Sequence, residues 1–199
     1  MRMSLRFPVA LVLSIICLSV PAWADFNAGG DAYTRGDYAT AFREWRPLAE
    51  QGDSQSQYNL GWLYYYGRGV PKDYAQARQW YKNAAAQGDT SAATNVGIMY
   101  LEGYGVPQDY LTALFWLRRA ADHGIAMAQG KLGVMYQEGW GPTQDYVEAH
   151  KWYNLAATYG DKPAADLRDA LANQMTPAQI AEAQKLAREW KPKTPSVPR

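Results

Sequence analysis

One interval of 36 residues recurs through the middle of the chain. The dipeptide Asp-Tyr returns at this interval, and so does a single glycine that follows it. The dipeptides begin at Asp37, Asp73, Asp109 and Asp145, and the glycines are Gly52, Gly88, Gly124 and Gly160. A fixed period of roughly 20 to 50 residues is typical of solenoids, in which each unit is too small to bury its own apolar face and must stack on its neighbours. The interval therefore predicts a stacked array and directs the search for function to a surface.

The first 24 residues have the features of an export signal. Arg2 and Arg6 precede an apolar run over residues 7–20, and Ala22-Trp23-Ala24 has the small residues that signal peptidases recognise. We expect a signal peptide over 1–24 and a periplasmic mature protein of a Gram-negative bacterium that begins at Asp25, with secretion as the alternative. The run is shorter than the roughly 20 residues that cross a bilayer. We therefore expect no stable membrane anchor after cleavage, and an uncleaved anchor is the competing interpretation.

Cleavage would also remove the only cysteine, Cys17. A lipoprotein signal is disfavoured because Ile16 precedes this cysteine, where Gly, Ala or Ser is needed. The mature chain would contain no disulfide, so its stability must come from packing. Without Arg2 and Arg6, 18 basic and 19 acidic residues remain and the net charge is near −1. This balance argues against nucleic acid or an anionic membrane surface as the partner.

Each unit begins with residues that repeat at helical spacing. Their steps of 3, 4 and 7 place them on one face of a first helix. The repeated sets are Gln57, Leu60, Gly61, Tyr64 and Gly67, then Ala93, Val96, Gly97, Tyr100 and Gly103, then Gln129, Leu132, Gly133, Tyr136 and Gly139. A glycine inside a helix costs about 1 kcal/mol relative to alanine. Its return at the same place therefore predicts the close approach of a second helix.

A second helix is predicted after each Asp-Tyr, because alanines and bulky residues again recur at steps of 3 and 4. The sets are Ala77, Trp80, Tyr81, Ala84 and Ala85, then Ala113, Trp116, Leu117, Ala120 and Ala121, then Ala149, Trp152, Tyr153, Ala156 and Ala157. We expect the alanines to pack on the glycine of the first helix and the aromatic residues to fill the space between units. The recurring glycines are expected to cap these helices at their C-terminal ends, and the aspartates to cap the N-terminal ends.

The combined pattern, Leu-Gly-x-x-Tyr-x-x-Gly-x-Gly-Val-Pro-x-Asp-Tyr-x-x-Ala-x-x-Trp-Tyr, resembles the Sel-one-like repeat (SLR) family, a relative of the tetratricopeptide repeat. The resemblance covers residues 53–160. It implies an all-α fold, a right-handed α-solenoid of antiparallel helix pairs. It also implies a scaffold for protein or peptide partners, with no common catalytic residues.

The units at the two ends are atypical, as expected where one face meets water. We assign residues 25–52 to a shortened first repeat or N-terminal cap, with Glu44 where the later units have tryptophan. Full repeats follow over 53–88, 89–124 and 125–160. In the third, Pro142 lies one place early in the loop, which predicts a different local turn.

Residues 161–191 are expected to form C-terminal capping helices, and 192–199 a flexible tail. The sequence Thr176-Pro177-Ala178-Gln179 is typical of a capping box. An apolar stripe then predicts a helix that covers the last repeat. Its residues are Ile180, Ala183, Leu186, Ala187 and Trp190.

The face of the first helices that lies opposite the repeated residues is the candidate binding surface. Stacked first helices line the concave side of such solenoids, so we expect one groove. Its residues are Gln55, Asn59, Trp62, Tyr66, Ser91, Asn95, Ile98, Glu102, Met127, Lys131, Val134 and Glu138. Its character changes from amide and aromatic to mixed apolar and charged, which suits a peptide bound in one direction. The alternative for Trp62 and Tyr66 is burial against the first unit.

Catalytic chemistry is not predicted. The two histidines, His123 and His150, make no familiar metal pattern, and no Ser-x-x-Lys occurs. The recurring aspartates are better explained as helix caps than as a carboxylate pair. We expect a monomeric, non-catalytic periplasmic scaffold or adaptor without metal or cofactor, which binds a protein or peptide segment in envelope regulation or assembly. The alternatives are a cell-wall-active, β-lactamase-like enzyme or glycan-binding protein, and a secreted effector.

Overall fold

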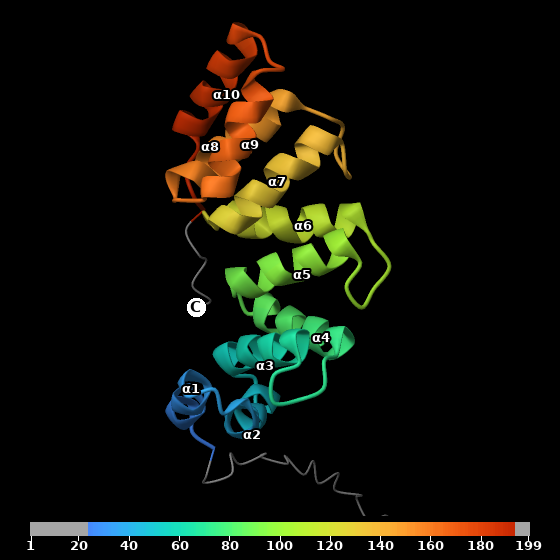
Figure 1. Ribbon diagram of the computed structural model, residues 1–199, viewed down its shortest axis with the longest axis vertical. Helices are drawn as coiled ribbons and strands as arrows, with labels where there is room; N and C mark the ends of the chain where they lie inside the picture. The colour runs from blue at the N-terminus through green and yellow to red at the C-terminus, as the bar shows by residue number, and fades with distance from the viewer. Residues whose placement is uncertain (1–23, 194–199) are drawn as a thin grey trace, which may run out of the picture.

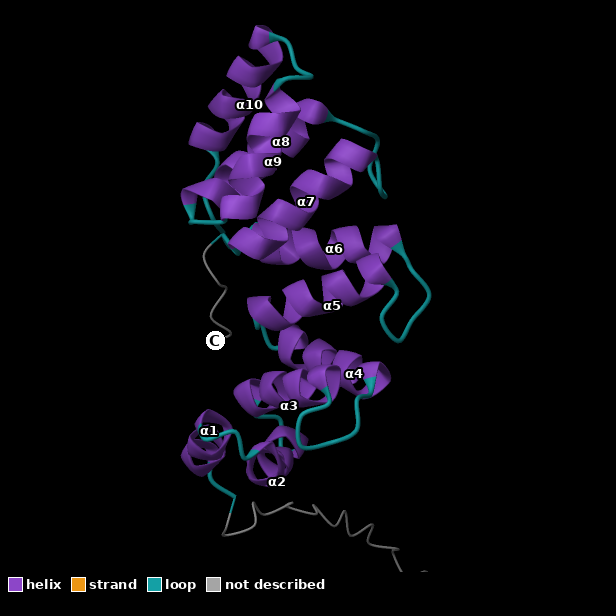
Figure 2. Ribbon diagram, in the orientation of Figure 1, coloured by secondary structure: helices purple, strands orange, loops and turns teal. Residues whose placement is uncertain are grey.

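The computed structural model describes residues 24–193, which form ten α-helices and no strand (Figures 1 and 2). The helices follow one another from one end of an elongated molecule to the other. They are α1 (Phe26–Thr34), α2 (Tyr38–Glu50), α3 (Ser54–Tyr66), α4 (Tyr74–Ala86), α5 (Thr90–Glu102), α6 (Tyr110–Ala121), α7 (Ala126–Glu138), α8 (Tyr146–Thr158), α9 (Lys162–Ala172) and α10 (Pro177–Glu189). The predicted all-α solenoid is confirmed. The expected signal peptide and most of the expected tail lie outside the described residues.

Polar caps begin the helices at the places the repeat predicts. The Asp73 carboxylate accepts hydrogen bonds from the backbone N–H groups of Ala75 and Gln76, at 2.9 and 3.0 Å. Asp109 and Asp145 do the same for α6 and α8. At Asp109, hydrogen bonds from Thr112 lower the pKa of the carboxyl group below its ordinary value. Each of these aspartates therefore caps the N-terminus of the helix that follows it, as predicted.

Within each unit the two helices meet at the helical glycine, but its partner differs from the prediction. A Cβ atom added to Gly133 would lie 2.4 Å from two ring atoms of Tyr153, and one added to Gly61 would lie 2.6 Å from the ring of Tyr81. The expectation that alanines pack on this glycine is therefore wrong. The larger side chain covers it because only a residue without Cβ leaves room for a flat ring against the backbone.

The first unit repeats this contact in shortened form. A Cβ atom on Gly29 would lie 2.4 Å from Nε1 of Trp45, and the indole N–H donates to the Phe26 carbonyl at 3.1 Å. Glu44, which takes the place of the later tryptophans, is only 7% exposed. Its carboxylate accepts a bond from the Asp25 backbone N–H at 3.2 Å. The shortened unit therefore keeps the packing rule of the others.

The loop with the early proline closes like its counterparts. The Asp145 N–H donates to the Tyr136 carbonyl at 2.9 Å, as Asp109 does to Tyr100 at 2.9 Å. Among the loop glycines, Gly141 differs most, with a φ of +90° compared with +68° at the equivalent Gly105. The predicted change of turn is therefore small, because glycine in the left-handed region absorbs it.

The C-terminal helices cover the last repeat, and α10 packs on its second helix, α8. Its capping box is present, since Thr176 and Gln179 bond each other's backbone N–H groups. The helix packs mainly against α8 and does not pair with α9 as a regular second helix would. Its residue Ala183 is fully buried with Tyr153 and Ala156 of α8.

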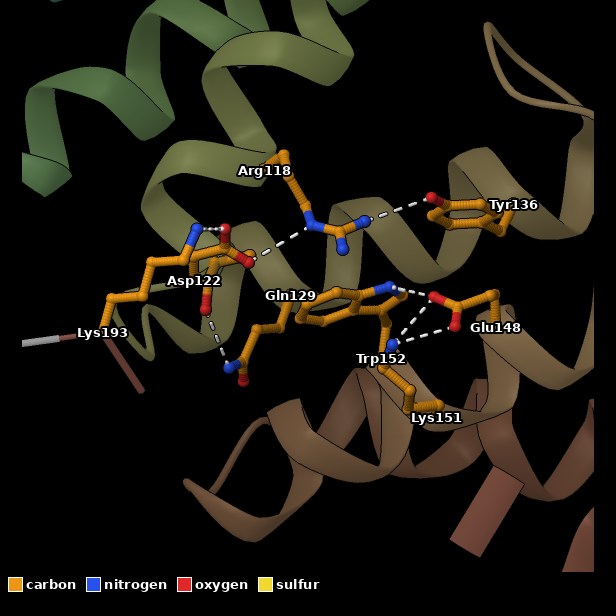
Figure 3. A network of polar contacts seen from close by, with 9 residues as sticks. Arg118, Asp122, Gln129, Tyr136, Glu148, Lys151, Trp152 and Lys193 are labelled. Carbon is orange, nitrogen blue, oxygen red and sulfur yellow. Dashed lines mark hydrogen bonds and ion pairs between the residues drawn. The ribbon is translucent and has the colours of Figure 1, made fainter. Parts of the chain in front are cut away.

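A polar network joins the third repeat to the end of the second (Figure 3). Arg118 of α6 donates to the Tyr136 hydroxyl at 3.2 Å and to Asp122 at 3.2 Å, and its guanidinium lies 4.9 Å from the ring of Trp152. The Trp152 indole N–H donates to Glu148 at 3.0 Å. A buried tryptophan is thus held by its own N–H and by a cation on its face.

The residues after α10 run back to this network. Trp190 meets Trp152 edge to face, with centroids 6.4 Å apart. The Lys193 N–H donates to the Asp122 carbonyl at 2.7 Å, and its ammonium donates to the Asp122 carboxylate at 2.6 Å. His123 Nδ1 lies 2.8 Å from the Lys193 carbonyl. The chain is therefore anchored at the turn between α6 and α7.

The glycine contact can be tested with Gly133→Ala. The ring of Tyr153 is 1% exposed and cannot move away, and overpacking of this kind costs about 1–3 kcal/mol. We expect a lower melting temperature by circular dichroism. Gly30→Ala in α1 is the matched control, because nothing lies within 4 Å of its added Cβ and alanine favours a helix by about 1 kcal/mol. Equal or higher stability of Gly133→Ala would contradict the contact.

A second prediction concerns His150 of α8, which is 3% exposed. Burial, with Arg168 nearby, lowers the pKa of its imidazole below the ordinary 6.5, and Asp169 opposes this only in part. The unfolded chain then binds a proton more readily than the folded one, so the free energy of unfolding falls as the pH drops below about 6.5. Denaturant titrations of His150→Gln should show a smaller loss between pH 7.5 and 5.5. An unchanged loss would exclude His150 as its source.

Candidate functional site

None of the twelve predicted groove residues is buried, so the predicted stripe faces outward. Those on the open surface are Gln55, Tyr66, Ser91, Glu102, Met127 and Glu138, and the half-buried ones are Asn59, Trp62, Asn95, Ile98, Lys131 and Val134. They belong to the first helices α3, α5 and α7, which follow one another along the stack (Figure 1). We call this face the groove.

The structure brings five of the twelve together around one pocket of about 230 Å³. They are Trp62, Tyr66, Asn95, Ile98 and Met127. The set takes at least one residue from each of three successive units, so no single repeat makes the pocket. An apolar hollow with one side-chain amide is a typical arrangement for binding, since the amide can hold a backbone group through paired donor and acceptor atoms.

Three further tyrosines line the pocket that sequence reasoning missed: Tyr58, Tyr65 and Tyr81. Tyr58 and Tyr65 lie beside the predicted stripe on α3, and Tyr81 reaches in from α4. The sequence of α3 could have predicted them, because it is rich in aromatic residues: Trp62 is followed by Tyr64, Tyr65 and Tyr66. Five aromatic side chains therefore surround one pocket.

The rings pack on one another from the first unit into the groove. Trp62 lies 4.7 Å from Tyr66 and 5.1 Å from Tyr33 of α1, measured between ring centroids. Burial against the first unit is thus partly correct for Trp62, which is half-buried there but still lines the pocket. Tyr66 is 52% exposed, and burial is wrong for it. Such pairs hold their rings in fixed orientations, so the pocket is already formed.

The other seven predicted residues do not line this pocket. Lys131 and Glu102 make an ion pair at 3.6 Å between α7 and α5, and both side chains are partly exposed. Val134 packs against the C-terminal apolar cluster, and Glu138 accepts a hydrogen bond from Gln137 at 3.2 Å. Gln55 and Ser91 are exposed and Asn59 is half-buried, and none of the three lines the pocket. Only the aromatic end of the predicted groove therefore forms this pocket.

Burial raises the pKa of three tyrosines of the pocket. The pKa of Tyr65 is raised to about 12, chiefly by burial, with Tyr104, Tyr74, Tyr66 and Glu102 adding to the shift. Burial also raises the pKa of Tyr81, and of Tyr58, where hydrogen bonding with Asn95 acts in the opposite direction. Tyrosine is already neutral at physiological pH because its ordinary pKa is about 10. The hydroxyl groups of the half-buried Tyr58 and Tyr65 can therefore donate to a ligand, whereas Tyr81 is only 1% exposed.

Groups that could carry catalysis are not gathered at this pocket. Within residues 24–193, no group of three or more His, Cys, Asp or Glu side chains is placed to hold a metal ion. His150 is buried in α8 and His123 contacts the Lys193 carbonyl, both outside the pocket lining. Over the same residues, no helix is long and apolar enough to cross a membrane. The pocket offers shape, aromatic faces and hydrogen bonds.

Three consecutive matches to the Sel1 repeat model cover residues 54–89, 90–125 and 126–161. The chain belongs to the Sel1 repeat family. Proteins of this family generally act as non-catalytic scaffolds for protein–protein interactions. The matched units begin one residue after the boundaries expected from the glycines.

Two solved structures are similar. A Sel1 repeat protein from Oxalobacter formigenes is 30% identical, with a TM-score of 0.70 over 83% of this chain and 70% of that one. The protein c5321, a protective antigen present in uropathogenic Escherichia coli strains, displays an SLR fold and is 29% identical, with a TM-score of 0.52 over 83% of this chain and 44% of that one. No curated protein matches the sequence.

The raised pKa of Tyr65 gives a test of the pocket's packing. A folded tyrosine that keeps its proton up to about pH 12, while the unfolded chain releases it near pH 10, loses its stabilising contribution as the pH rises between these values. Tyr65→Phe should therefore lose less free energy of unfolding between pH 10 and 12 than the original chain. Both proteins are compared at pH 8 as the reference. The same loss in both would show that Tyr65 is not buried as described.

Proposed function

We propose that this Sel1 repeat protein is an exported, non-catalytic adaptor that binds a segment of a partner protein in the groove. The pocket shared by three units carries the proposal. Its residues Trp62, Asn95 and Met127 come from α3, α5 and α7, so a ligand bound there would contact all three repeats. A repeat scaffold with such a shared surface can bind an extended segment of a partner protein. Binding of this kind requires no catalytic side chain.

The proposed periplasmic location is based on the expected signal peptide over residues 1–24. Basic residues, an apolar run and a small-residue cleavage site support export to the periplasm. A role in envelope regulation or assembly follows as the finer part of this proposal. Fractionation with an antibody to the folded repeats would test it, since recovery in the cytoplasm at the uncleaved length would contradict export.

Pull-down from a periplasmic extract tests the groove. The double variant Trp62→Ala, Asn95→Ala removes one ring and the single amide from the pocket. Central aromatic contacts cost about 2 kcal/mol or more when truncated, and 1.4 kcal/mol is tenfold in affinity. We expect partner recovery to fall about tenfold or more, measured by quantitative mass spectrometry.

A matched control keeps this test specific. Phe115→Ala removes a ring of α6 that is 60% exposed and does not line the pocket, so recovery of a partner held in the groove should not change. Circular dichroism of every variant must show an intact helical fold, because Trp62 also contacts the first unit. Equal recovery of each partner by the folded double variant would exclude the groove as the binding site.

A further inference from the structure

Helix α6 exposes large apolar side chains at places where the matching helix of the preceding unit does not. Leu111 and Phe115 are 68% and 60% exposed, and residues four apart lie on the same side of a helix. The positions 36 residues earlier, in α4, are Ala75 and Gln79, so the repeat forms without large apolar residues there. Exposed apolar residues that the fold does not require are typical of an interaction surface. We call the side of α6 that carries Leu111, Phe115 and Arg119 the α6 face.

A hollow of about 460 Å³ opens on the α6 face. Leu111, Leu114 and Phe115 supply its apolar lining. Tyr136 of α7 also lines it, so the hollow extends to the third repeat. The ring of Phe115 packs edge to face on the ring of Trp116, with centroids 5.3 Å apart. The hollow therefore has the volume and the apolar walls of a site that receives side chains of a ligand.

The hollow is positively charged. Three cations, Arg118, Arg119 and Lys193, line it with one carboxylate, that of Asp122, so its net charge is +2. This carboxylate accepts hydrogen bonds from both Arg118 and Lys193, at 3.2 and 2.6 Å (Figure 3). The chain as a whole is nearly balanced, with 20 basic and 19 acidic residues. A local excess of cations beside apolar residues therefore favours a partner surface that is both apolar and acidic.

The next unit shows what can cover such a face. Helix α8 packs against α7, α9 and α10, whereas α6 packs mainly against α5 and α7. Lys151 of α8, at the position equivalent to Phe115, is only 8% exposed. Leu155, equivalent to Arg119, is 6% exposed and lines a hollow together with Ala187 of α10. The helix that α8 has in addition is α10, so the face that α6 leaves open is covered in α8 by a helix.

Helix α10 also shows which kind of helix fits. It turns an apolar side toward α8, where Ala183 is fully buried with Tyr153, and Ile180 packs on the same cluster. The chain that leaves α10 then brings Lys193 to the hollow on α6. The surface that α10 covers therefore continues into the α6 face, where a further amphipathic helix has an exposed apolar surface to dock on.

We propose that the α6 face binds an amphipathic helix of a partner protein, with apolar residues at steps of three and four and acidic residues beside them. The apolar side chains fill the hollow at Leu111 and Phe115, and the carboxylates pair with Arg119 and Lys193. This site is separate from the aromatic pocket of the groove, because the two share no lining residue. The scaffold then has two binding surfaces that work independently.

A stapled helical peptide tests the proposal on the full chain. The probe is about 15 residues long, roughly 22 Å as a helix, with leucines at steps of three and four, glutamates beside them and a fluorescent label. Its matched control has lysine in place of every glutamate. Fluorescence anisotropy should show that the acidic peptide binds and that the lysine peptide binds at least tenfold more weakly. Added salt should weaken binding of the acidic peptide, because exposed charges are screened.

Variants of the chain locate the binding site. Leu111→Ala, Phe115→Ala should weaken binding of the acidic peptide tenfold or more, because it removes the central apolar contacts. Arg119→Glu should weaken the acidic peptide and strengthen the lysine peptide, a reversal that an unfolded variant cannot give. Gln79→Ala in α4, at the position equivalent to Phe115, is the matched control and should change neither affinity. Circular dichroism checks the helical fold of each variant.

Several outcomes would overturn the proposal. An acidic peptide that does not bind, or that binds the folded Leu111→Ala, Phe115→Ala variant equally well, would exclude the α6 face as its site. If phosphatidylglycerol vesicles bind through Phe115 and the peptide does not, the occupant is a membrane surface. A dimer in sedimentation that Phe115→Ala abolishes would make the occupant a second copy of the chain. The groove variant Trp62→Ala, Asn95→Ala should bind the peptide normally, so this proposal and the proposed function fail separately.

Discussion

Each helix pair in this solenoid is held together by a contact in which a helical glycine meets the flank of one large side chain. Gly29 meets Trp45, Gly61 meets Tyr81, Gly97 meets Leu117 and Gly133 meets Tyr153. The missing Cβ lets the backbones approach, and two alanines of each later second helix are fully buried beside the contact. They are Ala77 and Ala84, Ala113 and Ala120, and Ala149 and Ala156. The cost of glycine in a helix, about 1 kcal/mol, is offset by burial of a large side chain, worth about 1.5–3 kcal/mol. The distance between the two helices of each unit depends on this contact.

The same packing contact also forms the base of the pocket in the groove. Tyr81 covers Gly61 and also lines the pocket, so one residue serves both the fold and the site. The equivalent positions behave differently, since Leu117 has no hydroxyl and the Tyr153 hydroxyl donates to Gln137 at 2.9 Å. Only the first full unit therefore combines an aromatic floor with the rings of α3. This is why the pocket lies at that end of the groove.

The periodicity of the sequence predicts the features that all units share. It does not predict the residues that occur in one unit only. The helix pairs, the aspartate caps and the capping box at Thr176 follow from spacing and cap chemistry, which are local. Tyr58 and Tyr65 were missed because the third unit has Gly130 and Gln137 at the equivalent places, so no repeat draws attention to them. The partner of Gly61 was also misjudged, since alanines and Tyr81 share one helical face and spacing does not give the distance between helices. The docking of α10 on α8 depends on tertiary packing that no local signal carries.

The anchored C-terminal segment limits how this array can change in evolution. Solenoids readily gain or lose whole units because each contacts only its neighbours. Here Trp190 rests on Trp152 of the third repeat, while Lys193 bonds Asp122 and His123 of the second. The positions equivalent to Asp122 and His123 are Ala86 and Gln87 in one direction, and Thr158 and Tyr159 in the other. Duplication of the third repeat, or deletion of the second, would bring Lys193 to one of these turns, where no carboxylate receives it. The segment therefore fixes which unit must precede the last repeat, and these two units are not interchangeable with the others.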